Sequence, residues 1–64
     1  MDFEAIRSAV VLAHDSHFVS RINCGNSRID AESKARSYAL GMCKAFELAE
    51  LLTEEEATKI MLSI

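Results

Sequence analysis

Proline and tryptophan are absent from this 64-residue chain, and glycine occurs only twice. No stretch is rich in proline, glycine or serine, so no segment is a candidate linker, and we expect a single domain over residues 1–64. The chain also lacks any stretch in which apolar and polar residues alternate, which is the pattern of a half-buried strand. These absences leave an all-α protein as the expected fold class.

Long apolar runs and an export signal are missing as well. The longest uninterrupted apolar run covers residues 9–13, far short of the ~20 residues that cross a bilayer. The first residues include Asp2 and Glu4 instead of the basic and apolar regions of a secretory signal. We therefore expect a cytoplasmic protein in which Cys24 and Cys43 are buried thiols and form no disulfide.

The composition indicates self-association. Half of the residues are hydrophobic, and the formal net charge is -3. A chain of this length buries only about 60% of the surface that its unfolded form exposes. A core of that size rarely supplies more than roughly 3–5 kcal/mol without a disulfide, a metal or a partner chain. We expect a homo-oligomer.

A first helix is predicted over residues 2–22. Asp2 can accept hydrogen bonds from the free amides of the first turn. Two apolar stripes follow at helical spacing, and together they are wide enough to contact two neighbours. The first stripe consists of Phe3, Ile6, Val10, Ala13 and His17, and the second of Val11, Phe18 and Ile22.

A second helix is predicted over residues 28–52, after a turn in which Gly25 and Asn26 can adopt the left-handed conformation. An alanine-rich stripe with alternating spacings of four and three predicts a heptad-like seam against the first helix. It consists of Ala31, Ala35, Tyr38, Met42, Ala45, Ala49 and Leu52. Gly41 lies at the edge of this seam, where we expect it to allow close helix packing.

A short third helix is predicted over residues 54–63. Thr53 and Glu56 form a capping-box pattern, and three consecutive glutamates suit the positive end of a helix. So short a helix is not stable alone and has to pack on the rest of the chain or on a partner. The predicted architecture is a long antiparallel helical hairpin with a short C-terminal helix, assembled into an oligomer.

The residue patterns give no reason to expect catalysis, a cofactor or a metal. His14, Asp15 and His17 form the one cluster that suggests such chemistry. Their spacing does not match known zinc frameworks, and we interpret His17 as the edge of the apolar face. No nucleophile elbow or glycine-rich phosphate loop is present. We therefore expect a binding protein that is not an enzyme.

Charge is distributed unevenly. Arg21, Arg28 and Arg36 surround the turn between the two long helices and are candidates for binding an anionic ligand. The glutamates gather toward the end of the chain. Because the chain is acidic overall, we consider nucleic acid an unlikely partner, although the basic turn keeps a nucleic-acid accessory factor open.

Leu40 and Leu51 are predicted to lie on one side of the second helix, outside its main seam, and with Leu48 nearby they could form a strip. With Glu47 and Glu54 they are candidates for binding a protein partner, and packing against the third helix is the alternative. The sequence therefore favours a small helical inhibitor, adaptor or regulator, of the kind that bacteria and their viruses encode. The main alternative is an oligomer that binds a small anion or nucleotide at its subunit junctions.

Overall fold

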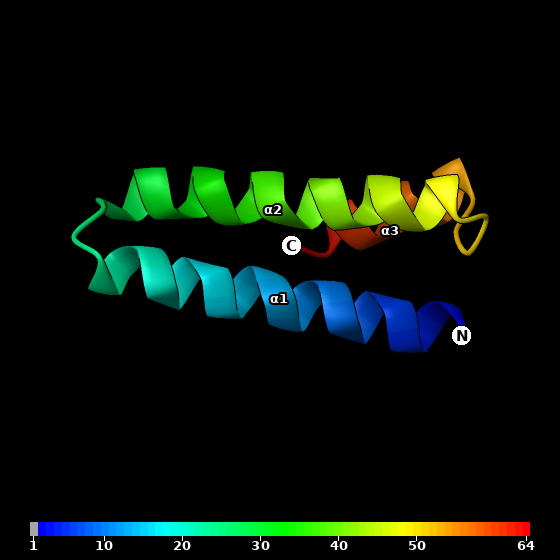
Figure 1. Cartoon of the computed structure of the whole chain (residues 1–64), viewed down its shortest axis with the longest axis horizontal. Coiled ribbons are helices and arrows are strands. Elements are labelled where there is room, and N and C mark those ends of the chain that lie inside the picture. The colour runs from blue at the N-terminus through cyan, green and yellow to red at the C-terminus, as the bar shows by residue number, and fades with distance from the viewer. Residues whose placement is uncertain (1) are drawn as a thin grey trace.

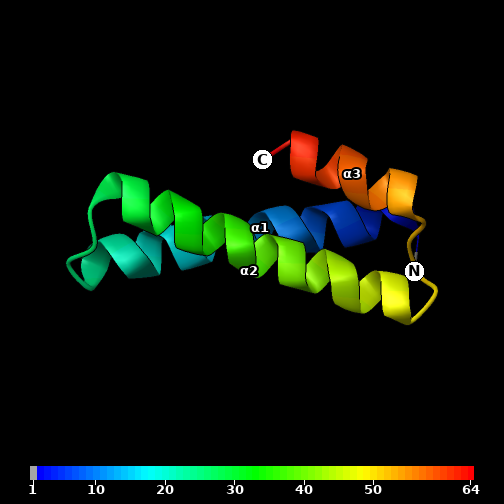
Figure 2. The same ribbon diagram turned by 90° about the horizontal axis from the view of Figure 1, so that it is seen from above.

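The computed structural model describes residues 2–64, which form three helices and no strand. Helix α1 spans Phe3–Asn23, α2 spans Arg28–Leu48 and α3 spans Glu54–Leu62. The two long helices run antiparallel, and α3 packs against both of them, along the half remote from the α1–α2 turn (Figures 1 and 2). The predicted all-α hairpin with a short third helix is therefore confirmed.

Side chains cap the amino ends of all three helices. Asp2, Ser27 and Thr53 each accept a hydrogen bond from a backbone amide three residues further on. At α3 the contact is reciprocal, because Thr53 Oγ1 accepts from the Glu56 amide at 3.1 Å and Glu56 Oε1 accepts from the Thr53 amide at 2.9 Å. The capping box read from the sequence is thus present, and it fixes where α3 begins.

The turn after α1 also has its predicted conformation. Gly25 has a φ of 93°, its amide donates to the Ile22 carbonyl at 3.0 Å, and the Asn26 amide donates to the Arg21 carbonyl at 3.1 Å. These two bonds form a Schellman motif, which satisfies the last carbonyls of a helix. Lys34 Nζ donates to Asn26 Oδ1 at 2.6 Å and so ties the turn to α2.

Helix α2 ends at Leu48, so the predicted end at residue 52 is wrong. A second Schellman motif closes it, with the Glu50 amide donating to the Glu47 carbonyl and the Leu51 amide to the Phe46 carbonyl, both at 2.9 Å. Glu50 has a φ of 62° at the position that glycine usually occupies. No glycine marks this helix end, which is why the sequence did not reveal it.

The face that α2 turns toward α1 differs from the predicted seam. Its buried residues are four apart throughout, whereas the predicted seam alternated spacings of four and three. Tyr38 and Ala45 are exposed as a result, and Leu52 reaches the core from beyond the helix. A row of residues four apart is one of the ridges by which helices pack, and its small side chains allow close approach. The fully buried row consists of Ala31, Ala35, Ala39 and Cys43.

The main core lies at the end of the hairpin that α3 covers. Helix α3 contributes Ala57 and Ile60 to it, which confirms that the short helix packs on the hairpin. In the half next to the turn, by contrast, the only fully buried side chains are Ala31 and Ala35. The core cluster consists of Ile6, Val10, Ala39, Cys43, Leu52, Ala57 and Ile60.

Gly41 does not serve the packing role that its position suggested. A Cβ atom built on Gly41 has no neighbour within 4 Å, because the buried row turns this residue toward solvent. The prediction that Gly41 permits close helix packing is therefore wrong. Its helical position also gives it no need for the left-handed conformation that Gly25 adopts.

Candidate interaction surfaces

Large apolar side chains remain exposed on all three helices. Ile29, Leu48 and Leu62 are the most exposed, with 80%, 87% and 78% of their surface accessible. Scattered exposed leucines are ordinary, but nine large apolar side chains are many for a chain of this size. The full set is Leu12, Val19, Ile22, Ile29, Tyr38, Leu40, Leu48, Leu51 and Leu62.

The three leucines predicted to form a strip on α2 do not form a continuous one. Leu48 is the last residue of α2 and is almost fully exposed. Leu40 is half-exposed and borders a depression of about 280 Å³ together with Met61 of α3. Leu51 follows the left-handed Glu50 and lies in the loop that leads to α3. The early end of α2 is what separates Leu51 from the other two.

The acidic candidates lie together at one end of the molecule. Glu47 is in the last turn of α2 and is half-buried, whereas Glu54 is exposed at the start of α3, next to Glu55 and Glu56. The α2–α3 loop brings these residues to the end opposite the α1–α2 turn (Figure 1). This end therefore combines negative charge with the exposed side chain of Leu48.

The three candidate arginines, in the half of the molecule next to the α1–α2 turn, have different surroundings. Arg28 Nε lies 3.8 Å from Glu32 Oε1, and Arg21 Nη2 lies 3.7 Å from the sulfur of Cys24. Arg21 Nε is buried and has no hydrogen-bond partner. Arg36 borders a cavity of about 200 Å³ between the helices, where Glu32 is also present. The half of the molecule next to the turn is therefore basic, but the three arginines do not meet at one pocket that could hold an anion.

His14 and His17 make different contacts. His14 Nδ1 lies 2.9 Å from Asp15 Oδ1, so this pair is local to one turn of α1. The ring of His17 stacks on Tyr38 of α2, with the ring centres 4.7 Å apart and the planes 11° from parallel. Within residues 2–64, no three His, Cys, Asp or Glu side chains come together as they would to hold a metal.

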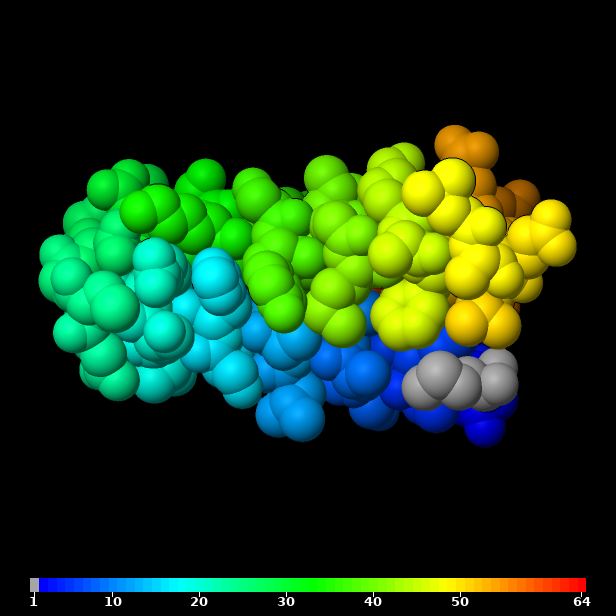
Figure 3. All heavy atoms as spheres, in the orientation of Figure 1, coloured from blue at the N-terminus to red at the C-terminus, as the bar shows by residue number. Residues whose placement is uncertain are grey.

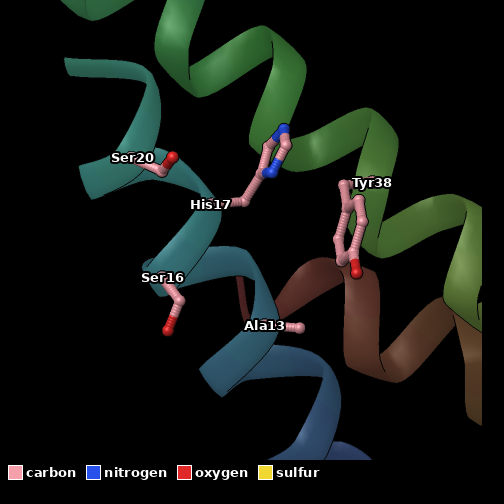
Figure 4. A pocket seen from close by; sticks show the side chains of 5 residues that line it. All are labelled: Ala13, Ser16, His17, Ser20 and Tyr38. Carbon is pink, nitrogen blue, oxygen red and sulfur yellow. The ribbon is translucent and has the colours of Figure 1, made fainter. Parts of the chain in front are cut away.

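The stacked pair lies beside a depression on the face of the hairpin turned away from α3. The two long helices meet along this face (Figure 3), and Figure 4 shows the two rings side by side between them. The depression measures about 270 Å³. Two hydroxyl groups and one methyl group complete its lining, from Ser16, Ser20 and Ala13. The sequence placed His17 and Tyr38 on facing seams, but only the structure shows that their rings stack.

The two cysteines are free and have different environments. Cys43 is buried in the core, and burial raises the pKa of its thiol, with the negative charge of Glu47 acting in the same direction and Lys44 in the opposite one. Cys24 is exposed, so the expectation that both thiols are buried is wrong for this residue. Cys24 is the C-cap residue of α1, directly after the last helical residue.

No protein-family model, curated protein or solved structure matches this chain. Within residues 2–64, no helix combines the length and the apolar character that crossing a bilayer requires.

Proposed function

We propose that this protein is a non-enzymatic helical interaction module, which self-associates and binds another macromolecule as an inhibitor, adaptor or regulator. The observation that supports this proposal is the set of large apolar side chains left on the surface, Leu48 and Leu62 foremost. An apolar side chain that is almost fully exposed gains free energy when a partner covers it. We place its action in the cytoplasm.

The acidic end is the surface that we assign to the foreign partner. Leu48 can enter an apolar pocket, while the surrounding carboxylates, including Glu47 and Glu54, attract a basic rim. Leu51, in the loop that leads to α3, is half-exposed at this end, and Leu40 is half-exposed two turns before Leu48. The partner that fits is a protein with a basic surface around an apolar depression.

The second candidate function is the binding of a small anion between the helices. The cavity of about 200 Å³ bordered by His14 and Arg36 favours this function. The carboxylate of Glu32 at the same cavity weakens it, because it offsets the charge of Arg36. A role as a nucleic-acid accessory factor through Arg21, Arg28 and Arg36 predicts salt-sensitive binding to DNA or RNA at low salt.

Native mass spectrometry of protein purified without added ligand tests these functions first. A whole multiple of the chain mass is the expected result, and a bound small molecule would instead favour the anion-binding function. A monomer at all concentrations would contradict the self-association part of the proposal.

Capture of partners by the immobilised protein tests the other part. Leu48→Glu should remove a partner that the unaltered protein retains, because a charge would then enter the apolar contact. Leu12→Glu is the matched control, since Leu12 is 68% exposed on the outer face of α1. Equal capture by both variants would overturn the assignment of the acidic end.

A further inference from the structure

Helix α3 lies along only half the length of α1 and α2. Beyond the end of α3, Ile64 meets His14, Glu32 and Arg36 around the cavity of about 200 Å³, and from there to the turn α1 and α2 continue side by side with no third helix beside them (Figure 2). Phe18 follows His14 by one helical interval of four, and so continues the same face of α1. We call this region the turn-half groove. From the helical spacing we assign to its walls His14, Phe18 and Ile22 of α1 and Ile29, Glu32 and Arg36 of α2.

We propose that the turn-half groove is filled by α3 of a second copy of this chain, in a two-fold symmetric dimer. The two copies face each other through their α3 sides and point in opposite directions. Each α3 then covers its own hairpin on one side and the uncovered half of the partner hairpin on the other. This proposal rests on the self-association proposed above and specifies its surface.

The lengths of the helices fit this arrangement. Helix α3 has 9 residues and each long helix has 21. At 1.5 Å per residue, two α3 helices placed end to end occupy about 27 Å of a groove that is about 31 Å long. One α3 from each copy therefore fills the groove between two hairpins without a gap wide enough for a further helix.

The charges are complementary in this orientation. The opposed directions place the first turn of the partner helix, which carries the partner's three consecutive glutamates, at the turn end of this chain. Residues 21–36 at that end carry four lysine and arginine side chains against two carboxylates. The partner's glutamates would therefore lie beside an excess of positive charge. The same contact occurs twice by symmetry.

The face of α3 that is turned away from its own hairpin carries an apolar residue for this contact. Glu55 and Leu62 are seven residues apart and both exposed, on the side of α3 opposite its buried residues Ala57 and Ile60. In the dimer, Leu62 lies near the two-fold axis, where each copy would cover the other, and Glu55 reaches the turn end. This placement explains why a short helix that already buries one face keeps a leucine 78% exposed on the other.

An engineered disulfide tests the geometry directly. The variant carries Ile22→Cys and Glu55→Cys in a Cys24→Ser background. Residues 22 and 55 lie at opposite ends of a molecule 36 Å long, so they cannot form a disulfide within one chain, whose Cα atoms must lie within about 7 Å. Mild oxidation should give a covalent dimer with two bonds. Leu12→Cys with Glu55→Cys in the same background is the control and should stay monomeric under denaturing conditions.

A second variant tests the energetics. Leu62→Glu should raise the dimer dissociation constant more than about 100-fold, because two charges would enter the centre of the interface. Circular dichroism should show unchanged helix content, since Leu62 makes little contact within its own chain. Leu12→Glu should leave the dissociation constant unchanged. Sedimentation velocity over a range of protein concentrations measures all three proteins.

The outcomes separate this proposal from the broader one. A dimer that resists Leu62→Glu and does not form the disulfide would overturn the α3 interface while leaving self-association intact. A monomer at every concentration would overturn both. A dimer that is covalently linked through residues 22 and 55 and dissociated by Leu62→Glu supports the proposed interface.

Discussion

The same substitution at the two glycines should change stability in opposite directions. Gly41 lies inside α2 with no atom within 4 Å of an added Cβ, so Gly41→Ala adds a methyl group to open solvent. Gly25 has equal space around it, but its φ of 93° is a conformation that alanine rarely adopts. Space is therefore the same at both sites, and only the backbone conformation differs.

The expected magnitudes follow from these conformations. Glycine in a helix interior is about 1 kcal/mol less favourable than alanine, so Gly41→Ala should stabilise the fold by that amount. A left-handed residue with a Cβ costs about 1–2 kcal/mol, and the reduced freedom of the unfolded chain offsets a part of it. We expect Gly25→Ala to destabilise by about 1 kcal/mol. For a domain of this size, each kcal/mol moves the melting temperature by about 4–8 °C.

Thermal unfolding followed by circular dichroism measures both effects. All proteins are compared at one concentration, because self-association would add to the apparent stability. The melting temperature should rise for Gly41→Ala and fall for Gly25→Ala. A lower melting temperature for Gly41→Ala would show that another helix approaches α2 at Gly41, and would refute the packing described above.

Three further predictions concern the end of α2 and the thiols. Glu50→Gly should raise the melting temperature, because glycine adopts the left-handed conformation without strain, whereas Ala49→Gly, next to it in a right-handed conformation, should lower it. A thiol reagent should label Cys24 quickly and Cys43 only as the chain unfolds, as mass spectrometry of timed samples can show. Burial raises the pKa of the Cys43 thiol, so as the pH rises the thiol loses its proton in the unfolded chain before it does so in the folded one. The free energy of unfolding measured in urea should therefore fall as the pH rises above about 8.5. This fall should be smaller in Cys43→Val, and rapid labelling of both thiols would contradict the burial of Cys43.

The sequence predicted those features of the fold that local chemistry determines. Asp2, Ser27 and Thr53 carry side-chain oxygens suited to the first amides of a helix, and each of them caps one. Gly25 indicates the end of α1 in the sequence, because few other residues tolerate its left-handed conformation. Such signals depend only on neighbours in the chain, so they can be read without knowledge of the packing.

The features that depend on packing could not be predicted in this way. Heptad-like and four-residue spacings overlap at Ala31 and Ala35, and only the contact with α1 and α3 selects the row that continues through Ala39. Glu50 replaces the glycine that would have marked the end of α2, which moved the expected end and the placement of Leu51. The surface candidates depend on which face each helix buries, so these errors carried over to them.

The distribution of large side chains along the molecule makes its stability uneven. Where α3 packs, isoleucine and valine fill the core, whereas near the turn the fully buried side chains are the methyl groups of Ala31 and Ala35. A methyl group gains little from burial, so the turn end can open locally while the other end stays folded. A partner that packs on the turn end would suppress this opening, which couples association to the local stability of that end.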